Sequence, residues 1–354
     1  EAGEASLLAL DPARVYEVDY LLAEGNTQAM SRWGHSMLRL VVCAPGRAPG
    51  PACRLDLAHH RVLSFRAFVG DVQISGWRGL TGSYPSRLFL LPLDQVIEEY
   101  TRVELRGLQS IPLRLQEDEI ASLLERAAQL HWSYDGRYYF IGNNCAVETW
   151  KLLHDGVPRL ADAPLASITP TGLLKKLERQ GVADAAVLED AGEARRLGYY
   201  FEPMSARYDA LYAVARDALA LPHPDAQAWL ALPPAGRAPW LPQADLRTSA
   251  ALLVLEHAAQ RRQQLLLRDA LKRRYLGRDA PDDIAPALQA LRTWLGDTGF
   301  VSRPSELLPD GYGLPQSEER MRVEKEAQLR LARLRVQDGA LREDLERWLP
   351  ADQR

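Results

Sequence analysis

Cys145 is the residue of this sequence whose surroundings best suit nucleophilic chemistry. It follows Asn143 and Asn144 in the stretch RYYFIGNNCAVETWKLLHDGVP, and helix signals begin directly after it and end at Gly156. The positive end of a helix dipole lowers the pKa of a thiol and favours the thiolate, which attacks carbonyl carbon. The N–H of Cys145 and a side-chain amide of Asn144 or Asn143 are candidate donors to the resulting oxyanion. The alternative is a packing residue, because free cysteine is among the most buried residue types.

A thiol nucleophile needs a nearby histidine to accept its proton. The chain has seven histidines, and their spacing alone does not select one. His35 follows Gly34 at the predicted start of a strand, where a base could project over a sheet edge. His131 and His154 lie near the ends of predicted helices. The residues by themselves leave the identity of the base open.

The other two cysteines predict a disulfide. Cys43 and Cys53 bracket the segment APGRAPGPA, a turn between two predicted strands, and neighbouring strands can hold two cysteines at bonding distance. A bridge here would indicate an oxidising compartment and would leave Cys145 as a free thiol. The alternative is two reduced thiols in a cytosolic hairpin.

The composition excludes several classes of protein. The 354 residues are 47% apolar and 25% charged, which is typical of a folded globular chain. The formal net charge of −4 gives no reason to expect nucleic acid as a partner. No apolar run approaches the roughly 18 residues of a membrane span. No CxxC motif or zinc-finger spacing occurs, and the adjacent His59 and His60 would point to opposite faces of a strand, so neither a metal nor a cofactor is predicted.

The predicted elements place the candidate residues in an α+β unit of about residues 1–200. Strand signals occur at 14–25, 31–43, 61–71, 87–93 and 103–115. Helix signals occur at 95–100, 116–132, 145–156 and 169–181. A helical region, residues 201–354, follows, with helix-like segments at 208–221, 246–277 and 317–348.

Single residues mark some of the boundaries of these elements. Asp94 could cap the short helix after it, and Pro112 favours an edge strand or a break. Thr169 as cap and Gly181 as stop enclose the last helix of the α+β unit. A Gly-rich segment, GDVQISGWRGLTGSYPS, separates two of the strands and could either line a cleft or form an ordinary loop.

Four segments occur in an order that resembles the circularly permuted papain-like thiol enzymes. In that superfamily, which includes the lecithin retinol acyltransferase family, the histidine strand precedes the cysteine helix. The segments are most similar to a bacterial family that resembles the N-terminal periplasmic domain of Bacteroides lipoprotein N-acyltransferase. The resemblance covers roughly residues 12–180. The segments read WGHSMLRL, RVLSFRAFVGD, GSYPSRLFLLPLDQVIEEY and RYYFIGNNC.

The resemblance implies a thioester mechanism on a permuted papain-like core, an antiparallel sheet with a cysteine-bearing helix. Cys145 would attack an acyl carbonyl, with His35 as base and then acid. The third polar residue would be Ser64, at the centre of its strand pattern, with His60 as the second choice. Asn144 matches the family residue before the cysteine, as an oxyanion donor or a helix cap.

The residues and the resemblance together favour a periplasmic or otherwise extracytoplasmic cysteine acyltransferase or hydrolase of a bacterium. Its substrate would be a lipid or another molecule with acyl ester or amide groups. Two alternatives share these observations: a cysteine peptidase or cell-wall amidase, and a noncatalytic envelope scaffold or binding protein. Between Arg261 and Arg274 lie six basic residues and one acidic residue, so this helix could contact an anionic membrane. A solvated helix face is the alternative.

Overall fold

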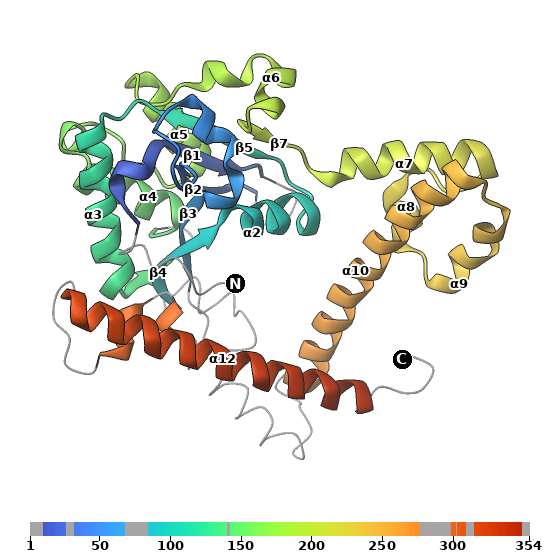
Figure 1. Ribbon diagram of the computed structural model, residues 1–354. Helices are drawn as coiled ribbons and strands as arrows, with labels where there is room; N and C mark the ends of the chain where they lie inside the picture. The colour runs from blue at the N-terminus through green and yellow to red at the C-terminus, as the bar shows by residue number, and fades with distance from the viewer. Residues whose placement is uncertain are drawn as a thin grey trace.

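The fold is organised around a seven-stranded antiparallel sheet (Figure 1). The computed structural model describes residues 10–25, 32–67, 84–139, 142–276, 299–301, 303–308 and 315–348. The strands lie in the spatial order β6-β4-β3-β2-β1-β5-β7. Their bounds are β1 Val15–Ala23, β2 His35–Val42, β3 Arg61–Ala67, β4 Tyr84–Pro92, β5 Leu108–Leu113, β6 Gly136–Tyr138 and β7 Tyr200–Phe201.

Helices cover both faces of the sheet and make up the second half of the chain. The α-helices are α2 Leu93–Ile97, α3 Glu117–Ser133, α4 Cys145–Gly156, α5 Pro170–Arg179, α6 Ala191–Arg196, α7 Met204–Leu219, α8 Ala226–Ala231, α9 Pro234–Arg237, α10 Leu246–Leu276 and α12 Ser317–Trp348. A π-helical turn, η5, spans Glu98–Val103. The 3-10 turns are η2 Pro12–Arg14, η3 Pro51–Leu55, η4 Leu57–His59, η6 Pro158–Leu160, η7 Ala185–Leu188, η8 Ala238–Gln243, η10 Gly299–Val301 and η11 Pro304–Leu307.

The alternation of side chains along β2 decides which residues reach the candidate site from each face. In the β1–β2 pair, Leu22 lies opposite Ser36, and Ala23 lies opposite His35. Successive side chains of a strand point to opposite faces, and directly paired residues share a face. Ser36 therefore faces one side of the sheet and His35 faces the other.

The face that carries Ser36 holds the larger core. Leu22 and Leu38 of the sheet are buried there against α3, α4 and α5, whose inward residues include Leu153 and Leu173. The opposite face holds a smaller core, in which Met37 is buried with α2 and with Tyr100 of η5. The sheet thus separates the cysteine helix from the layer that surrounds His35.

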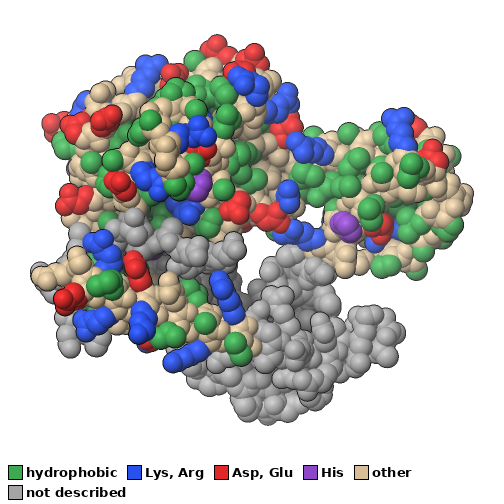
Figure 2. Space-filling model, in the orientation of Figure 1, with side chains coloured by type: hydrophobic (Ala, Val, Ile, Leu, Met, Phe, Trp, Pro, Cys, Tyr) green, Lys and Arg blue, Asp and Glu red, His purple; other side chains and the backbone are tan. Residues whose placement is uncertain are grey.

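The helical half begins with a group that has its own core. Trp229 of α8 and Leu255 of α10 are buried at its centre, with α7 on the third side (Figure 1). In Figure 2 hydrophobic side chains are spread over the visible surface of this group. Leu246 and Leu253 of α10 are exposed. An ion pair from Arg261 of α10 to Glu98 of η5 connects the group to the sheet.

The segment before α12 returns to the sheet unit. The buried Arg87 of β4 bonds Asp135 at 2.9 Å, Glu306 of η11 at 2.9 Å and the carbonyl of Gly299 at 3.1 Å. Arg303 donates to the carbonyl of Ser133, the last residue of α3, at 3.1 Å. These bonds join the C-terminal part of the chain to the end of α3 and to the start of β6.

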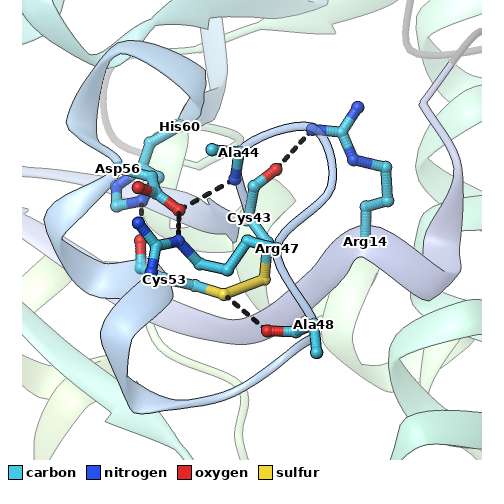
Figure 3. The surroundings of a disulfide bond; sticks show 8 residues. All are labelled: Arg14, Cys43, Ala44, Arg47, Ala48, Cys53, Asp56 and His60. Atoms are coloured by element: carbon cyan, nitrogen blue, oxygen red, sulfur yellow. Dashed lines mark hydrogen bonds and ion pairs between the residues drawn. A yellow bond between two sulfur atoms is a disulfide. The ribbon is translucent and has the colours of Figure 1, made fainter.

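Cys43 and Cys53 form the predicted disulfide, with Cα atoms 4.6 Å apart (Figure 3). Cys43 directly follows β2, whereas Cys53 lies in the 3-10 turn η3 and not on a neighbouring strand. The connecting turn is closed by Asp56, which accepts from the N–H of Ala44 at 2.8 Å and pairs with Arg47 at 2.7 Å. The bridge leaves Cys145 as the free cysteine.

The predicted α+β class, with an antiparallel sheet, a cysteine-bearing helix and a following helical region, is confirmed. Two local predictions are wrong. Asp94 is not a cap, because α2 begins one residue earlier, after Pro92. Residues 103–107 are not extended, because η5 continues to Val103 and Leu105 has a φ of 55°. The predicted strand residues 68–71 and most of the Gly-rich segment lie outside the described residues.

Within the described part of the chain, no helix combines the length and the apolar character needed to cross a membrane.

Candidate thiol site at the start of helix α4

Cys145 is the first residue of α4, where the side chain of Asn144 caps the helix. Asn144 Oδ1 accepts from the N–H groups of Ala146 and Val147 at 3.0 and 3.3 Å. Ser, Thr, Asp and Asn are the residues that cap helix starts in this way. The cap fixes the first turn, so the Cys145 side chain starts from a rigid position. Only 5% of Cys145 is exposed.

The thiol lies against the peptide that joins His35 to Ser36. The N–H and the hydroxyl of Ser36 favour the thiolate, as do the N–H groups of Ala146 and of Cys145 itself. Burial acts in the opposite direction and is the larger effect, so the pKa of the Cys145 thiol is raised. The expectation that the helix start lowers this pKa is therefore wrong for the resting protein, because desolvation outweighs the favourable donors.

Two tyrosine hydroxyls approach the same place. Tyr20 donates to the carbonyl of Pro170 at 2.8 Å, and its phenol lies near Ser36 and Cys145. The oxygen of Tyr138 accepts from the N–H of Cys145. Burial, followed by the Cys145 charge, raises the pKa of the Tyr138 phenol, so Tyr138 keeps its proton at neutral pH.

The imidazole of His35 lies in the other layer and bonds Ser64. His35 Nε2 is 3.0 Å from Ser64 Oγ, and Arg66 Nε donates to the same oxygen at 3.0 Å. Arg66 also donates to both carboxylate oxygens of Glu99, at 3.0 and 3.1 Å. The ring of His35 stacks on Tyr100, with centroids 6.1 Å apart and 17° between the planes. These contacts hold the ring on two sides.

The charge state of His35 follows from these neighbours. Burial lowers its pKa to about 3, and the positive charges of Arg66 and Arg106 act in the same direction. At pH 7 the ring is therefore neutral and can accept a proton. Because the thiol of Cys145 is also protonated, the resting pair is neutral, unlike a thiolate–imidazolium ion pair.

Strand β2 lies between the thiol of Cys145 and the imidazole of His35. Ser36, which contacts the thiol, and His35 project from opposite faces of β2. No hydrogen bond joins His35 to Cys145 among the described residues. Tyr138 nevertheless lies near both groups. Its phenol oxygen accepts from the backbone N–H of Cys145, and its pKa is raised by burial and also by Tyr100, the residue on which His35 stacks. The two groups thus lie at the same end of the sheet.

The structure does not bring His60 to His35. The Nδ1 atom of His60 accepts from Arg39 Nη2 at 2.8 Å, and Nε2 lies 2.9 Å from the carbonyl of Cys53 (the disulfide is drawn in Figure 3). Burial and the charge of Arg39 lower the pKa of His60 to about 4. Arg39 is paired in turn with the buried Asp19, at 3.6 Å. His60 therefore belongs to a charged cluster next to the disulfide, and Ser64 is the partner of His35.

The two asparagines before the cysteine make other bonds. Asn144 Nδ2 donates to the carbonyl of Ile168 at 3.0 Å. Asn143 donates to the carbonyl of Arg137 at 2.8 Å and to Glu148, and accepts from Lys151 at 2.8 Å. In this state both side chains hold the turn before α4, and the proposed oxyanion role of either amide stays a prediction.

Sequence reasoning did not assign chemistry to Ser36, Tyr20, Tyr138 or Arg66. The alternation of side chains along the strand in WGHSMLRL predicts that Ser36 and His35 lie on opposite faces of the sheet. This alternation is the sequence signal that could have identified Ser36. The approach of Tyr138 to Cys145 depends on the pairing of β6 with β4, which no local pattern indicates. Among the residues that the structure describes, no three metal-ligating side chains converge on a common point.

Comparison with known protein families matches residues 4–180 to the Lnb N-terminal periplasmic domain. The matched span is half of the chain and includes Cys145, His35, Ser64 and the disulfide. No curated protein and no solved structure matched the chain. The match agrees with an oxidising compartment, in which a disulfide persists. The chain therefore belongs to the Lnb N-terminal periplasmic domain family and is an extracytoplasmic bacterial protein.

Proposed function

We propose that this chain is a cysteine acyltransferase or hydrolase that carries an acyl group as a thioester on Cys145. The observation behind the proposal is the free thiol at the start of α4, beside the peptide that joins His35 to Ser36. His35 is in turn held by Ser64. A nucleophile, a base and a group that orients the base are the parts that thiol acyl transfer requires.

The tautomer of His35 decides whether the ring can act as a base. When Nε2–H donates to Ser64 Oγ, Nδ1 keeps its lone pair and can take the proton of the thiol. Ser64 can accept this bond together with the bond from Arg66, because a hydroxyl oxygen has two lone pairs. Since the ring and the thiol lie on opposite faces of β2, the proton would pass round the start of the strand through one water.

The bonds that form and break follow from this proton transfer. The thiolate of Cys145 adds to the acyl carbonyl carbon, and a C–S bond and an oxyanion form. The oxyanion would replace Tyr138 at the N–H of Cys145, and the Tyr138 hydroxyl would donate to the same oxygen. Collapse breaks the ester or amide bond, and the leaving alcohol or amine takes the proton from His35. Water or an amine then attacks the thioester and restores the thiol.

Two exposed apolar side chains support an acyl substrate. Trp33 is 53% exposed and precedes His35 by two residues, and Ile168 is 58% exposed at the carbonyl that Asn144 binds. Large apolar side chains beside a few polar reactive groups are typical of sites for ligands with hydrocarbon parts. We therefore propose a lipid ester or amide as the acyl donor.

Peripheral membrane contact through Arg261–Arg274 remains part of the proposal. Arg261 pairs with Glu98, so this end of the segment is attached to the sheet unit. The side chains from residue 264 onward in α10 lie outside the described residues. We also propose that the chain divides into a thiol enzyme domain, residues 1–200, and a helical accessory region, residues 201–354.

Chemical labelling distinguishes this function from its alternatives. Under nonreducing conditions Cys145 is the free thiol, so every thiol adduct found by mass spectrometry can be assigned to it and checked by peptide mapping. Labelling by a long-chain acyl phosphonate, and not by a peptide-based thiol electrophile, would support acyl transfer. The reverse preference would support a peptidase or amidase. Absence of labelling by both probes would support a noncatalytic scaffold and sink the enzyme proposal.

A further inference from the structure

The hydroxyl of Ser36 is a buried polar group that has no hydrogen bond of good geometry in the part of the chain that the structure describes. Ser36 is the second residue of β2 and has no exposed surface. Its Oγ has no hydrogen-bond partner among the described residues. Buried hydroxyls are nearly always paired, because an unpaired one loses its bonds to water and gains none in return. An orphan of this kind therefore indicates a hydrogen bond that forms only when a neighbouring group changes its charge.

The neighbours of Ser36 limit which group this can be. The side chain faces the α4 layer, where the thiol of Cys145 and the phenol of Tyr20 approach it. Tyr20 already donates its hydrogen to the carbonyl of Pro170, at 2.8 Å. The oxygen of Tyr20 keeps a lone pair and can accept a hydrogen, as can the sulfur of Cys145. A protonated thiol is a weak acceptor, whereas a thiolate is a strong one.

The charges near the sulfur give this hydroxyl a role. The other groups that favour the thiolate are the backbone N–H groups of Ser36, Cys145 and Ala146, which the strand and the helix hold in place. Ser36 supplies the side-chain donor, and a hydroxyl can rotate toward a new charge. Arg66, whose charge acts on His35, is bonded to Ser64 and Glu99 in the other layer.

We propose that Ser36 stabilises the Cys145 thiolate, and that its hydroxyl donates to the sulfur when the thiol loses its proton. Ser36 keeps its own proton throughout, so the step moves only one proton, from the sulfur to the base. This inference rests on the proposed function, because it assigns Ser36 to the nucleophile of that reaction. The two serines then have different roles: Ser64 orients the base His35, and Ser36 stabilises the nucleophile Cys145.

The variant Ser36→Ala tests this assignment without any substrate. The rate of alkylation of Cys145 by iodoacetamide between pH 7 and 9 is proportional to the thiolate fraction. Loss of one hydrogen bond to a charged sulfur is expected to raise the thiol pKa, so that Ser36→Ala reacts roughly tenfold more slowly across this range. The substitution removes one atom and opens space, so reduced access cannot explain a slower rate.

Two matched variants complete the design. Ser36→Thr keeps the hydroxyl and is expected to react within about threefold of the wild type. Ser86→Ala removes the hydroxyl of another serine, on β4, that is buried and has no hydrogen-bond partner in the described part of the chain, and is expected to leave the alkylation rate unchanged. Equal or faster alkylation of Ser36→Ala would overturn the inference. If Ser36→Ala slows alkylation while the wild type forms no thioester with any acyl donor, the proposed acyl transfer fails and thiolate stabilisation by Ser36 stands.

Discussion

At the scale of residues, the two groups of the proposed reaction, Cys145 and His35, are both neutral at rest. Burial raises the pKa of the Cys145 thiol, and burial with two arginines lowers the pKa of His35 to about 3. The local helix-start pattern of the sequence made Cys145 a candidate, whereas His35 was selected among seven histidines only by the family resemblance. The sequence could not give their protonation, because desolvation depends on the assembled core. In the proposed reaction, proton transfer from Cys145 would therefore follow substrate entry.

The neutral His35 ring makes stability depend on pH. The unfolded chain takes up a proton on this ring near pH 6.5, whereas the folded chain resists it down to about pH 3. The free energy of unfolding is therefore expected to fall as the pH falls from 6.5 toward 3. Urea denaturation of the wild type and of His35→Gln at pH 7.5 and 5 measures this. Because His60 titrates in part of the same range, the variant is expected to lose only part of the slope. An equal slope in both proteins would contradict the account of His35.

At the scale of elements, the sequence identified those that carry their own start and stop signals. Thr169 caps α5 through the N–H of Gly172 at 3.2 Å, and Gly181 has the positive φ, 67°, expected after a helix. The π-helical turn η5 and the two-residue strand β7 were not predicted. β7 exists because it pairs with β5, more than eighty residues earlier in the chain, and such pairing leaves no local pattern.

The cap of α4 is expected to stabilise the fold and to position the thiol. Asn144→Ala removes both the cap and the bond to the Ile168 carbonyl, and is expected to lower the free energy of unfolding by about 1 kcal/mol. Asn144→Asp keeps an oxygen for the cap and is expected to lose less. Its negative charge beside the thiol should slow iodoacetamide labelling of Cys145. Urea titration and labelling rates measure the two effects. Faster labelling of Asn144→Asp would argue against a thiol that reacts as thiolate.

At the scale of the whole molecule, two arginines of the described residues attach the C-terminal half to the sheet unit. One is Arg261, which pairs with Glu98. The other is Arg87, which links Asp135, directly before β6, to Glu306 of η11. Since β6 carries Tyr138, the second attachment holds the strand whose phenol contacts the N–H of Cys145. The sequence indicated a helical second half but not where it docks.

Removal of the Arg87 side chain tests this attachment. Arg87→Met removes the cation nearest to Asp135 and Glu306 and leaves them the longer ion pairs with Arg303, at 3.8 and 3.9 Å, so it is expected to loosen η10 and η11 from the sheet unit. Hydrogen exchange followed by mass spectrometry should show faster exchange in residues 299–308 and 133–138. Arg102→Met, which removes an exposed helix ion pair, is the matched control and should leave these peptides unchanged. Unchanged exchange in Arg87→Met would show that other contacts hold the segment.

Detection of an acyl thioester on Cys145 by mass spectrometry tests the central claim most directly. Nonreduced protein is mixed with phospholipid vesicles, quenched in acid and examined by intact mass spectrometry. The account predicts a mass increase of one acyl chain that maps to Cys145 and is removed by neutral hydroxylamine. Cys145→Ala should show no such adduct, and His35→Gln should form it at least about a hundredfold more slowly. An adduct that persists in Cys145→Ala, or no adduct with any lipid or acyl ester donor, would contradict the account.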